Sequence, residues 1–509
     1  MVWLEPFIAT VVLIAVSVTI ATVIGIPTAW ACTVLRESNR RMRTIANLAV
    51  AILGIVAFVP LVLHGAAWEA TAGKFGLTML TQTGTSTSAS GNYVFFSGMI
   101  ATAWIHGVYG SSIVALATLY GVERMPRSLI DQSRLDAGPV ERWWKIRLPV
   151  AKPWCVIGMM AVAGIAVTEM TIADLYGYRT IADQFYLNYA LRPTVSAIAW
   201  TTVLPLILAL MLIFHWSGSS SGRVFQNESR RESVSSSENE NYHPLVRVSA
   251  LSILLAAILV AAVVPITGLI TNLGREVIQA DGQFTATWSI RLVLERVTVA
   301  PTVFASEYQW TAMIAAVTSL TSVAIAWPLA SLGRRRDRVG RLIDFATIAM
   351  VCVPGPIVGL AVVTLFQADV PGFPFLYQQT ILPTTISMLM RGIPVSYWII
   401  RSGYRAIASQ TLDLARLDAS PVRQFWSIER PLVFRSLIAA ALVSAVVTSG
   451  DLPVSLPVIP AGVTTVPVRL FGLLHSGARY QEAALVFWYV LAIVFVFGLL
   501  RLVYTTKTD

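Results

Sequence analysis

Charge is scarce in this sequence. Asp, Glu, Lys and Arg together make up 13% of the 509 residues, against ~25% in an average soluble protein. Hydrophobic residues make up 56%, so the chain has too few polar side chains to cover a surface that faces water. The composition therefore excludes most cytosolic enzymes, nucleic-acid-binding proteins and secreted disulfide-rich domains, and it predicts an integral membrane protein.

Cysteines are few and nucleotide-binding motifs are absent. The three cysteines, Cys32, Cys155 and Cys352, lie in apolar stretches without C-x-x-C spacing, so we expect no disulfide, metal site or redox pair. No G-x-x-x-x-G-K-[ST] phosphate loop is present, and the nearest Gly-Lys pair, Gly73-Lys74, is followed by Phe75. No catalytic motif occurs either. The sequence thus predicts neither an enzyme nor a chain that binds ATP or another cofactor itself.

What the sequence does contain is a series of long apolar runs. A membrane crossing needs ~20 mainly apolar residues, because the hydrocarbon core is ~30 Å thick and a helical residue rises ~1.5 Å. Eleven runs meet this requirement and predict an all-α polytopic membrane protein. They span roughly 7–31, 45–67, 94–120, 153–175, 194–216, 250–272, 309–332, 343–366, 379–402, 432–454 and 482–504.

Basic residues predict the orientation, because they are retained on the cytoplasmic side. The clusters after the first and seventh runs are Arg36, Arg40, Arg41 and Arg43, and Arg334, Arg335, Arg336, Arg338 and Arg341. We therefore expect the N-terminus outside and, with eleven crossings, the C-terminus in the cytoplasm. The longest outside loops are then roughly 69–93 and 273–308. The alternative, a missed twelfth crossing, would invert half of the chain and scatter the basic clusters.

A serine-rich stretch divides the chain, with nine serines between Ser217 and Arg247 and no hydrophobic periodicity. Such a composition is typical of a solvated linker. We predict a first half at 1–216 with five crossings, a cytoplasmic linker at 217–249, and a second half at 250–509 with six crossings.

Two predicted cytoplasmic loops repeat one pattern. Residues 131–149 and 413–431 are identical at ten of nineteen positions. These are Asp131/Asp413, Arg134/Arg416, Leu135/Leu417, Asp136/Asp418, Ala137/Ala419, Pro139/Pro421, Val140/Val422, Trp144/Trp426, Ile146/Ile428 and Pro149/Pro431. Six crossings separate the copies, so both lie on one side and the two bundles form a parallel repeat around one pathway. This disfavours transporters that are built from inverted repeats.

The register of the repeat extends beyond these loops. The further matches are Gly110/Gly392, Gly121/Gly403 and Glu169/Asp451 at a separation of 282, and Val59-Pro60/Val353-Pro354 at 294. Each loop predicts a helix, a turn and a short aromatic helix before Pro149 or Pro431, which favour the first turn of the next crossing. One such helix alone would be interpreted as an interfacial anchor. Its duplication on one face favours docking of a two-fold symmetric partner.

The end of each copy resembles a loop of ABC importer permeases of the binding-protein-dependent type, which carries E-A-A-x3-G-x9-I-x-L-P. The matching residues are Ile146, Leu148 and Pro149, and Ile428 and Pro431; Arg430 replaces the Leu, and Asp136 and Asp418 replace the Gly. The run VPGPIVGLA at 353–361, with a weaker partner at 59–67, is similar to the fused, double-length permeases of the ferric-iron and thiamine group.

The resemblance implies a multi-pass translocation subunit in the cell (inner) membrane. Family members form the substrate pathway, two copies of an ATP-binding subunit dock on the two loops, and an extracytoplasmic solute-binding protein delivers the cargo. The expected partners are therefore these subunits and membrane lipid, with no nucleic acid. The candidate coupling residues are Asp131, Arg134, Asp136, Gly138, Pro139, Trp144, Ile146 and Pro149, and Asp413, Arg416, Asp418, Ser420, Pro421, Trp426, Ile428 and Pro431.

Three ionisable residues are candidates for the pathway itself. Glu169 and Asp451 each end an apolar run after a repeated loop, which places them in the outer third of the hydrocarbon core, and Arg391 lies at a similar depth. Two carboxylates would favour a cationic cargo such as ferric iron or thiamine, unless Arg391 neutralises one of them. The alternative is that the helix simply ends at Asp451 and leaves the acid at the surface.

Two other classes stay open. A secondary transporter or channel would need no nucleotide, and a polytopic membrane enzyme or sensor would need a catalytic or sensing motif that the sequence does not provide. Co-purification of an ATPase subunit whose inactivation stops transport would distinguish the importer from the secondary transporter or channel.

Overall fold

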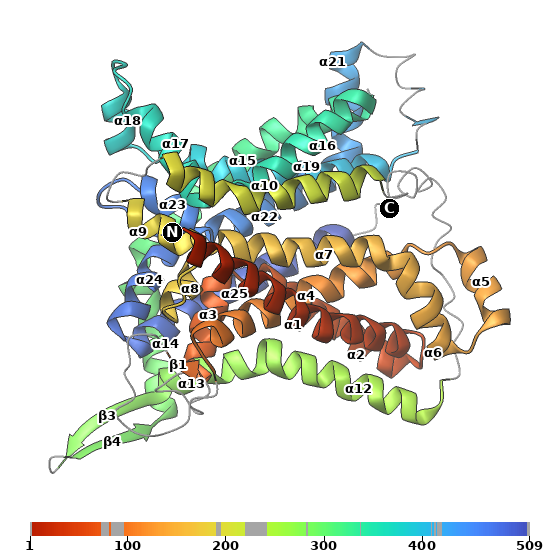
Figure 1. Cartoon of the computed structure of the whole chain (residues 1–509), viewed down its shortest axis with the longest axis horizontal. Helices are drawn as coiled ribbons and strands as arrows, with labels where there is room; N and C mark the ends of the chain where they lie inside the picture. Colours follow the sequence, from red (N-terminus) through yellow and green to blue (C-terminus); the bar gives the residue numbers. More distant parts are fainter. Residues whose placement is uncertain are drawn as a thin grey trace. The chain divides into compact units, whose positions relative to one another are not determined.

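The computed structural model describes residues 3–72, 81–82, 96–189, 195–218, 242–280, 283–335, 337–408, 410–411, 414 and 420–505. This described part of the chain is mainly helical (Figure 1). It contains nine helical spans that are long and apolar enough to cross a membrane, and one bent pair of helices that would make a tenth. The protein is thus a multi-pass helical membrane protein, which confirms the predicted class.

The nine spans coincide with predicted crossings. They correspond to α1 (Leu4–Arg36), α2 (Arg40–Phe58), α4 (Gly98–Glu123), α7 (Leu148–Thr168), α10 (Val195–Gly218), the continuous run of α12 (Pro244–Ile258), η3 (Leu259–Val263) and α13 (Val264–Gly274), α15 (Ala305–Arg335), α22 (Arg430–Ser449) and α25 (Arg479–Thr505). The spans of α7 and α22 begin earlier than these helices, at Pro139 and Pro421. The predicted crossing at 379–402 is α19 (Leu382–Arg405), which carries Arg391, Arg401 and Arg405 and is therefore less apolar. The number of eleven crossings stays a prediction.

Short helices connect the long ones. They are α5 (Arg127–Asp136), α6 (Pro139–Arg142), α8 (Thr171–Leu175), α9 (Ile181–Tyr189), α18 (Phe373–Gln379), α21 (Pro421–Arg423), α23 (Leu452–Ser455), the 3-10 turn η5 (Leu456–Val458) and α24 (Val466–Ser476). Two of them, α6 and α21, begin at a proline, whose missing N–H costs nothing in a first helical turn.

The predicted crossings at 45–67 and 343–366 are not continuous helices. α2 ends before Val59-Pro60 and α3 (Leu61–Ala72) follows, whereas α16 (Asp337–Cys352) ends before Val353-Pro354 and α17 (Gly355–Phe366) follows. Proline lacks an N–H and disfavours the helical conformation of the residue before it. The matched Val-Pro dipeptides therefore mark a break in both halves, and α16 and α17 meet at 97°.

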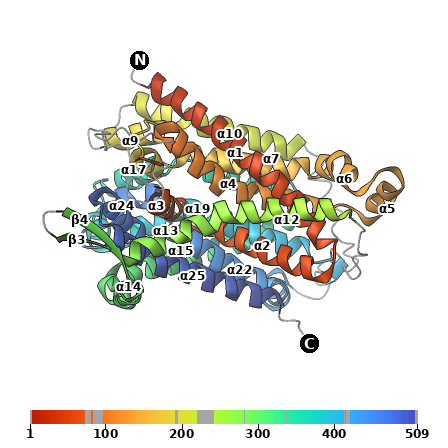
Figure 2. The same cartoon turned by 90° about the horizontal axis from the view of Figure 1, so that it is seen from below.

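The chain divides into two compact units. Unit 1 comprises Met1–Thr201, Ser235–Val303 and Leu470–Trp488, and unit 2 comprises Thr202–Val234, Phe304–Arg469 and Tyr489–Asp509. In unit 1, α12 lies along α1 and α2 (Figure 2), and Tyr242, Ala250 and Leu254 join the apolar core around Trp30. The helices that follow the linker thus pack with the first part of the chain.

Each unit contains a set of three long helices in close contact: α1, α4 and α7 in unit 1, and α15, α19 and α22 in unit 2. Glycines that the repeat matches lie at these contacts. A Cβ atom on Gly110 would lie 2.6 Å from Val162 of α7, and one on Gly392 would lie 3.0 Å from Ser444, the matched residue of α22. Glycine therefore lets the backbones approach closely in both sets, as is common between membrane helices.

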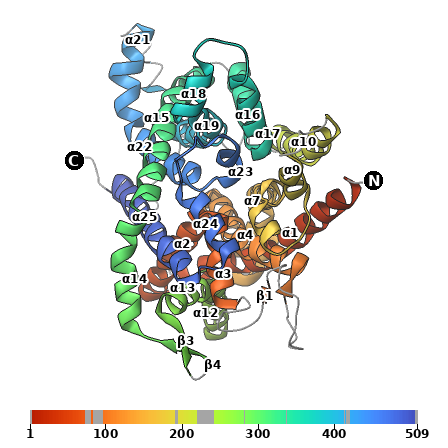
Figure 3. The same ribbon diagram turned by 90° about the vertical axis from the view of Figure 1, so that its left-hand side faces the viewer.

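The predicted outside loop at 273–308 has regular structure. It forms an antiparallel hairpin of β3 (Arg275–Ala280) and β4 (Gln283–Trp288), followed by α14 (Ile290–Val303), all in unit 1 (Figure 3). A further two-residue pairing joins β1 (Thr81–Gln82) and β2 (Phe96–Ser97). The purely helical prediction missed these strands, because hydropathy averaged over ~20 residues hides a two-residue alternation.

Candidate functional site

In each unit a short helical segment leads directly into a long helix. In unit 1 it consists of α6 and the π-turn η1 (Trp143–Arg147) before α7, and in unit 2 of α21 and the π-turn η4 (Gln424–Glu429) before α22. We call these segments the first and the second junction. Both lie in the repeated loops, and α7 and α22 begin at matched positions.

The same local chemistry starts both junctions. Pro139 and Pro421 occupy the first helical turn, and the residues before them, Gly138 and Ser420, are extended, with ψ of 160° and 154°. A 2.8 Å backbone hydrogen bond to the carbonyl of Gly138 or Ser420 closes the first turn in each case. The predicted turns therefore lie where the sequence placed them.

Pro149 and Pro431 lie in the first turn of α7 and α22. The structure differs from the expectation in one respect, because the π-turn joins each junction to its long helix without a break. A π-turn tolerates the loss of an i→i−4 bond that a proline causes. Each junction is thus mechanically continuous with a membrane-spanning helix.

A buried ion pair holds the first junction against the end of α1. Arg147 Nη1 lies 2.7 Å from Glu37 Oε1, and the Tyr242 hydroxyl donates to Glu37 Oε2 at 2.7 Å. The indole Nε1 of Trp143 donates to Thr33 Oγ1 at 3.3 Å. Only 4% of the Arg147 side chain is exposed, so the pair is partly shielded from water and from salt.

The second junction is held against the end of α15 in a similar way. Arg335 Nη2 lies 2.7 Å from Glu429 Oε1, and the hydroxyls of Ser331 and Tyr404 both donate to Glu429 Oε2 at 2.7 Å. The rings of Trp327 and Phe425 stack with their centroids 4.0 Å apart. Glu429 therefore receives three donors in a buried position.

The candidate coupling residues are for the most part on the surface of these segments. Trp144 is 43% and Trp426 54% exposed, whereas Ile146 and Ile428 are half-buried. Asp131 and Arg134 form an exposed ion pair at 3.3 Å on α5. The side chain of Asp136 and the residues Asp413, Arg416 and Asp418 lie outside the described part of the chain.

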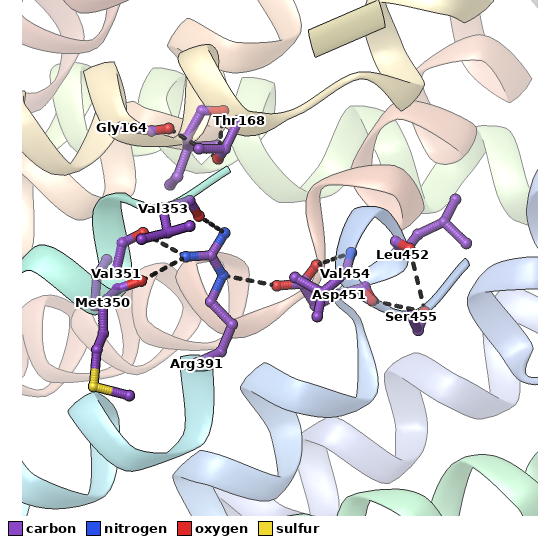
Figure 4. Close-up of polar contacts among 11 residues, drawn as sticks. Gly164, Thr168, Met350, Val351, Val353, Arg391, Asp451, Leu452, Val454 and Ser455 are labelled. Carbon is purple, nitrogen blue, oxygen red and sulfur yellow. Dashed lines mark hydrogen bonds and ion pairs between the residues drawn. The ribbon is translucent and has the colours of Figure 1, made fainter. Parts of the chain in front are cut away.

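Glu169 and Asp451 occupy equivalent places, where a long helix ends and a short one begins. Glu169 accepts hydrogen bonds from the backbone N–H groups of Thr171 and Ile172 at 2.7 and 2.9 Å, at the start of α8. Asp451 accepts from the N–H of Val454 at 3.2 Å, at the start of α23 (Figure 4). Both acids therefore cap helices, the usual role of a carboxylate before a first turn.

Arg391 contacts Asp451 and also the end of α16. Its Nε lies 3.1 Å from Asp451 Oδ2, and its two Nη atoms donate to the carbonyl oxygens of Met350, Val351 and Val353 at the helix break (Figure 4). The structure thus brings two of the three candidate pathway residues together. α22 ends just before Asp451, as the alternative interpretation expected. Asp451 is nevertheless only 15% exposed and is paired with Arg391, so it is not solvated at the surface.

Unit 1 places a tyrosine where unit 2 has this arginine. Tyr109 matches Arg391 in the repeat, and its hydroxyl donates to the carbonyl oxygen of Ala57 at 2.9 Å, at the end of α2. The breaks in the two halves are thus fastened from equivalent positions by different side chains. Glu169 instead lies 3.8 Å from His106 Nε2.

A second buried ionic cluster in unit 1 was not predicted. Arg479, at the start of α25, lies 3.7 Å from Glu69 of α3 and 3.6 Å from Glu482, and the Tyr176 hydroxyl donates to Glu69 at 2.9 Å. Sequence reasoning passed over these residues because each stands next to the polar end of an apolar run. Their spacing along the chain gives no sign that they meet.

Close to this cluster, α24 contacts α8 through His475 and Asp174, whose Nε2 and Oδ2 atoms are 3.0 Å apart. The hydrogen bond to Asp174 raises the pKa of His475. Both side chains are partly exposed, so the pair contributes little to stability.

Among the described residues, no group of three or more His, Cys, Asp or Glu could hold a metal ion. No protein-family model and no curated protein matches the sequence. The fold thus defines a class, a multi-pass helical membrane protein, and a function has to be argued from the junctions and the helix breaks.

Proposed function

We propose that the chain is the permease subunit of an ABC importer, embedded in the cell membrane with its N-terminus outside and its C-terminus in the cytoplasm. The observation that carries this proposal is the duplicated junction. Each copy has a proline start, a π-turn that leads into a long helix, and an exposed tryptophan at the matched position, Trp144 or Trp426. Two equivalent surfaces in one chain suit a two-fold symmetric pair of ATP-binding subunits.

The continuity of each junction with a long helix supports a coupling role. α7 has 21 residues, which at ~1.5 Å per residue span the ~30 Å hydrocarbon core. A displacement of the first junction would therefore move the far end of α7, where Glu169 caps α8. The second junction is linked through α22 to Asp451 in the same way. ATP hydrolysis would take place in the partner subunits, and a solute-binding protein would deliver the cargo from outside.

The cargo suggested by the resemblance, ferric iron or thiamine, gains no support from these contacts. Arg391 neutralises Asp451, and Glu169 is used as a helix cap. A secondary transporter or channel is the alternative function, and it would need no docking partner at the duplicated exposed tryptophans.

A double substitution of the exposed tryptophans tests the proposal. Trp144→Glu with Trp426→Glu should abolish co-purification of the ATPase subunit and ATP-dependent uptake, because two charges replace the aromatic contact surface. The amount of inserted protein should stay near that of the wild type, since both side chains are exposed. Lys145→Ala, on the same turn and 73% exposed, is the matched control and should retain both. Unchanged uptake in the double variant would instead favour a transporter without nucleotide.

The proposed orientation is tested by labelling with an impermeant thiol reagent. In a chain whose three buried cysteines are replaced by alanine, we expect Ser86→Cys to react in intact cells and Ser236→Cys to react only after permeabilisation. Labelling of Ser236→Cys from outside would overturn both the orientation and the parallel arrangement of the repeat.

A further inference from the structure

The two junction ion pairs have opposite polarity. In unit 1 the junction provides the arginine, Arg147, and the end of α1 provides the glutamate, Glu37. In unit 2 the junction provides the glutamate, Glu429, and the end of α15 provides the arginine, Arg335. Arg147 and Glu429 are matched positions of the repeat, so the charge is reversed at equivalent places.

Apart from polarity, the two pairs are alike. In both, the charged nitrogen and oxygen are 2.7 Å apart, and the glutamate also accepts a 2.7 Å hydrogen bond from a tyrosine hydroxyl. The junction residue is the buried partner, 4% exposed for Arg147 and 2% for Glu429, and the helix-end residue is 25% or 26% exposed. The same contact thus exists twice with its charges exchanged.

Because the two halves are similar, a wrong pairing of junction and helix can compete with the native pairing during folding. The loops are identical at ten of nineteen positions, so each junction resembles the one that packs on the long helix of the other unit. Arg147 is separated from Arg335 by less than twice the 110 residues that separate it from Glu37. A doubled loop length gives only a roughly threefold preference for the shorter closure.

The reversed polarity destabilises this wrong pairing. Docking of the first junction on α15 would place Arg147 against Arg335, and docking of the second junction on α1 would place Glu429 against Glu37. Each mispairing buries two like charges, and their repulsion costs far more free energy there than it would at an exposed surface. Repulsion against a wrong partner is a common source of specificity between similar surfaces.

We propose that the exchanged charges specify which junction packs on which helix, so that each junction docks on the long helix of its own unit. This proposal does not depend on the nature of the transport or on an ATPase. It makes Glu37, Arg147, Arg335 and Glu429 determinants of the internal pairing of the chain.

Charge exchange within one half tests it. Glu37→Arg with Arg147→Glu restores an opposite-charge pair in unit 1 but gives both halves the polarity of unit 2, and Arg335→Glu with Glu429→Arg does the converse. In either double variant only the preference from chain length is left, roughly threefold for the first junction and roughly eightfold for the second, which is 94 residues from Arg335 and 392 from Glu37. About a tenth of the chains or more should therefore carry the mispaired second junction. The quadruple variant exchanges both pairs and should return to the wild-type level.

Mispairing is measured by disulfide trapping in the full chain. Thr33 lies against Trp143, so a mispaired second junction brings the matched position, Phe425, to Thr33. Every variant therefore carries Thr33→Cys and Phe425→Cys in the background without native cysteines, and the cross-linked fraction is compared after membrane insertion. The monomeric fraction in gel filtration is the second measurement, because repeats that pair wrongly also exchange between chains.

The quadruple variant is the decisive control. It contains every local disturbance of both double variants, such as the loss of the acceptor for Tyr242, so its recovery cannot be explained by local packing. Cross-linking that rises in both double variants and falls again in the quadruple variant supports the proposal. Wild-type behaviour of the double variants, or failure of the quadruple variant together with them, overturns it.

Discussion

Arg391→Ala is expected to destabilise unit 2 by about 3–5 kcal/mol, because it removes one partner of a largely buried ion pair and leaves the Asp451 carboxylate without its cation. Arg391 and Asp451 are 11% and 15% exposed, so water can replace little of the lost interaction. The same substitution removes the donors to three carbonyl groups at the end of α16. The apparent melting temperature in detergent should fall sharply.

The matched control for this substitution lies in unit 1. Tyr109→Phe removes one hydrogen bond, to the carbonyl of Ala57, and should cost about 0.5–1.5 kcal/mol. Asp451→Asn combined with Arg391→Ala should recover part of the loss, since it removes the unpaired charge but leaves an oxygen for the helix cap. Equal effects of Arg391→Ala and Tyr109→Phe would show that the charge at this helix break contributes nothing beyond a hydrogen bond.

Long apolar runs predicted the membrane class, because a membrane crossing is recognised from length and composition alone, as ~20 consecutive apolar residues. Helix breaks were not predicted, although the Val-Pro dipeptides that cause them had been matched. Hydropathy counts apolar residues and carries no information about backbone direction. The runs at 45–67 and 343–366 therefore looked like single crossings, whereas Pro60 and Pro354 divide them.

The ion pairs of the two junctions were not predicted from the sequence, for a different reason. Repeat detection relies on identical residues, but Arg147 and Glu429 differ in the two copies while the contact that they make is retained with its charges exchanged. Sequence order was also a poor guide to packing. The helices of 244–303 follow the linker, yet they belong to unit 1, and the hydropathy of a membrane helix does not indicate which neighbour it contacts.

The close approach of α3 and α13 in unit 1 gives the second large expected effect. A Cβ atom at Gly268 would lie 2.5 Å from the backbone nitrogen of Thr71 and 2.7 Å from its Cα. The Thr71 hydroxyl also donates across this contact to the carbonyl of Val264 at 2.7 Å. Because the obstacle is backbone, no change of rotamer relieves it, and Gly268→Ala must separate the two helices.

We therefore expect Gly268→Ala to cost about 1–3 kcal/mol through overpacking, and Gly268→Val to cost more, both measured as a lower melting temperature of the purified protein. Gly164→Ala is the matched control, since a Cβ atom at this glycine of α7 would meet nothing within 4 Å, and alanine favours a helix by about 0.5–1 kcal/mol over glycine. Thr71→Ala should not rescue Gly268→Ala, because it removes the hydroxyl and leaves the backbone of α3 in place. A full rescue would mean that only the threonine side chain, and not the approach of the two backbones, requires glycine at this position.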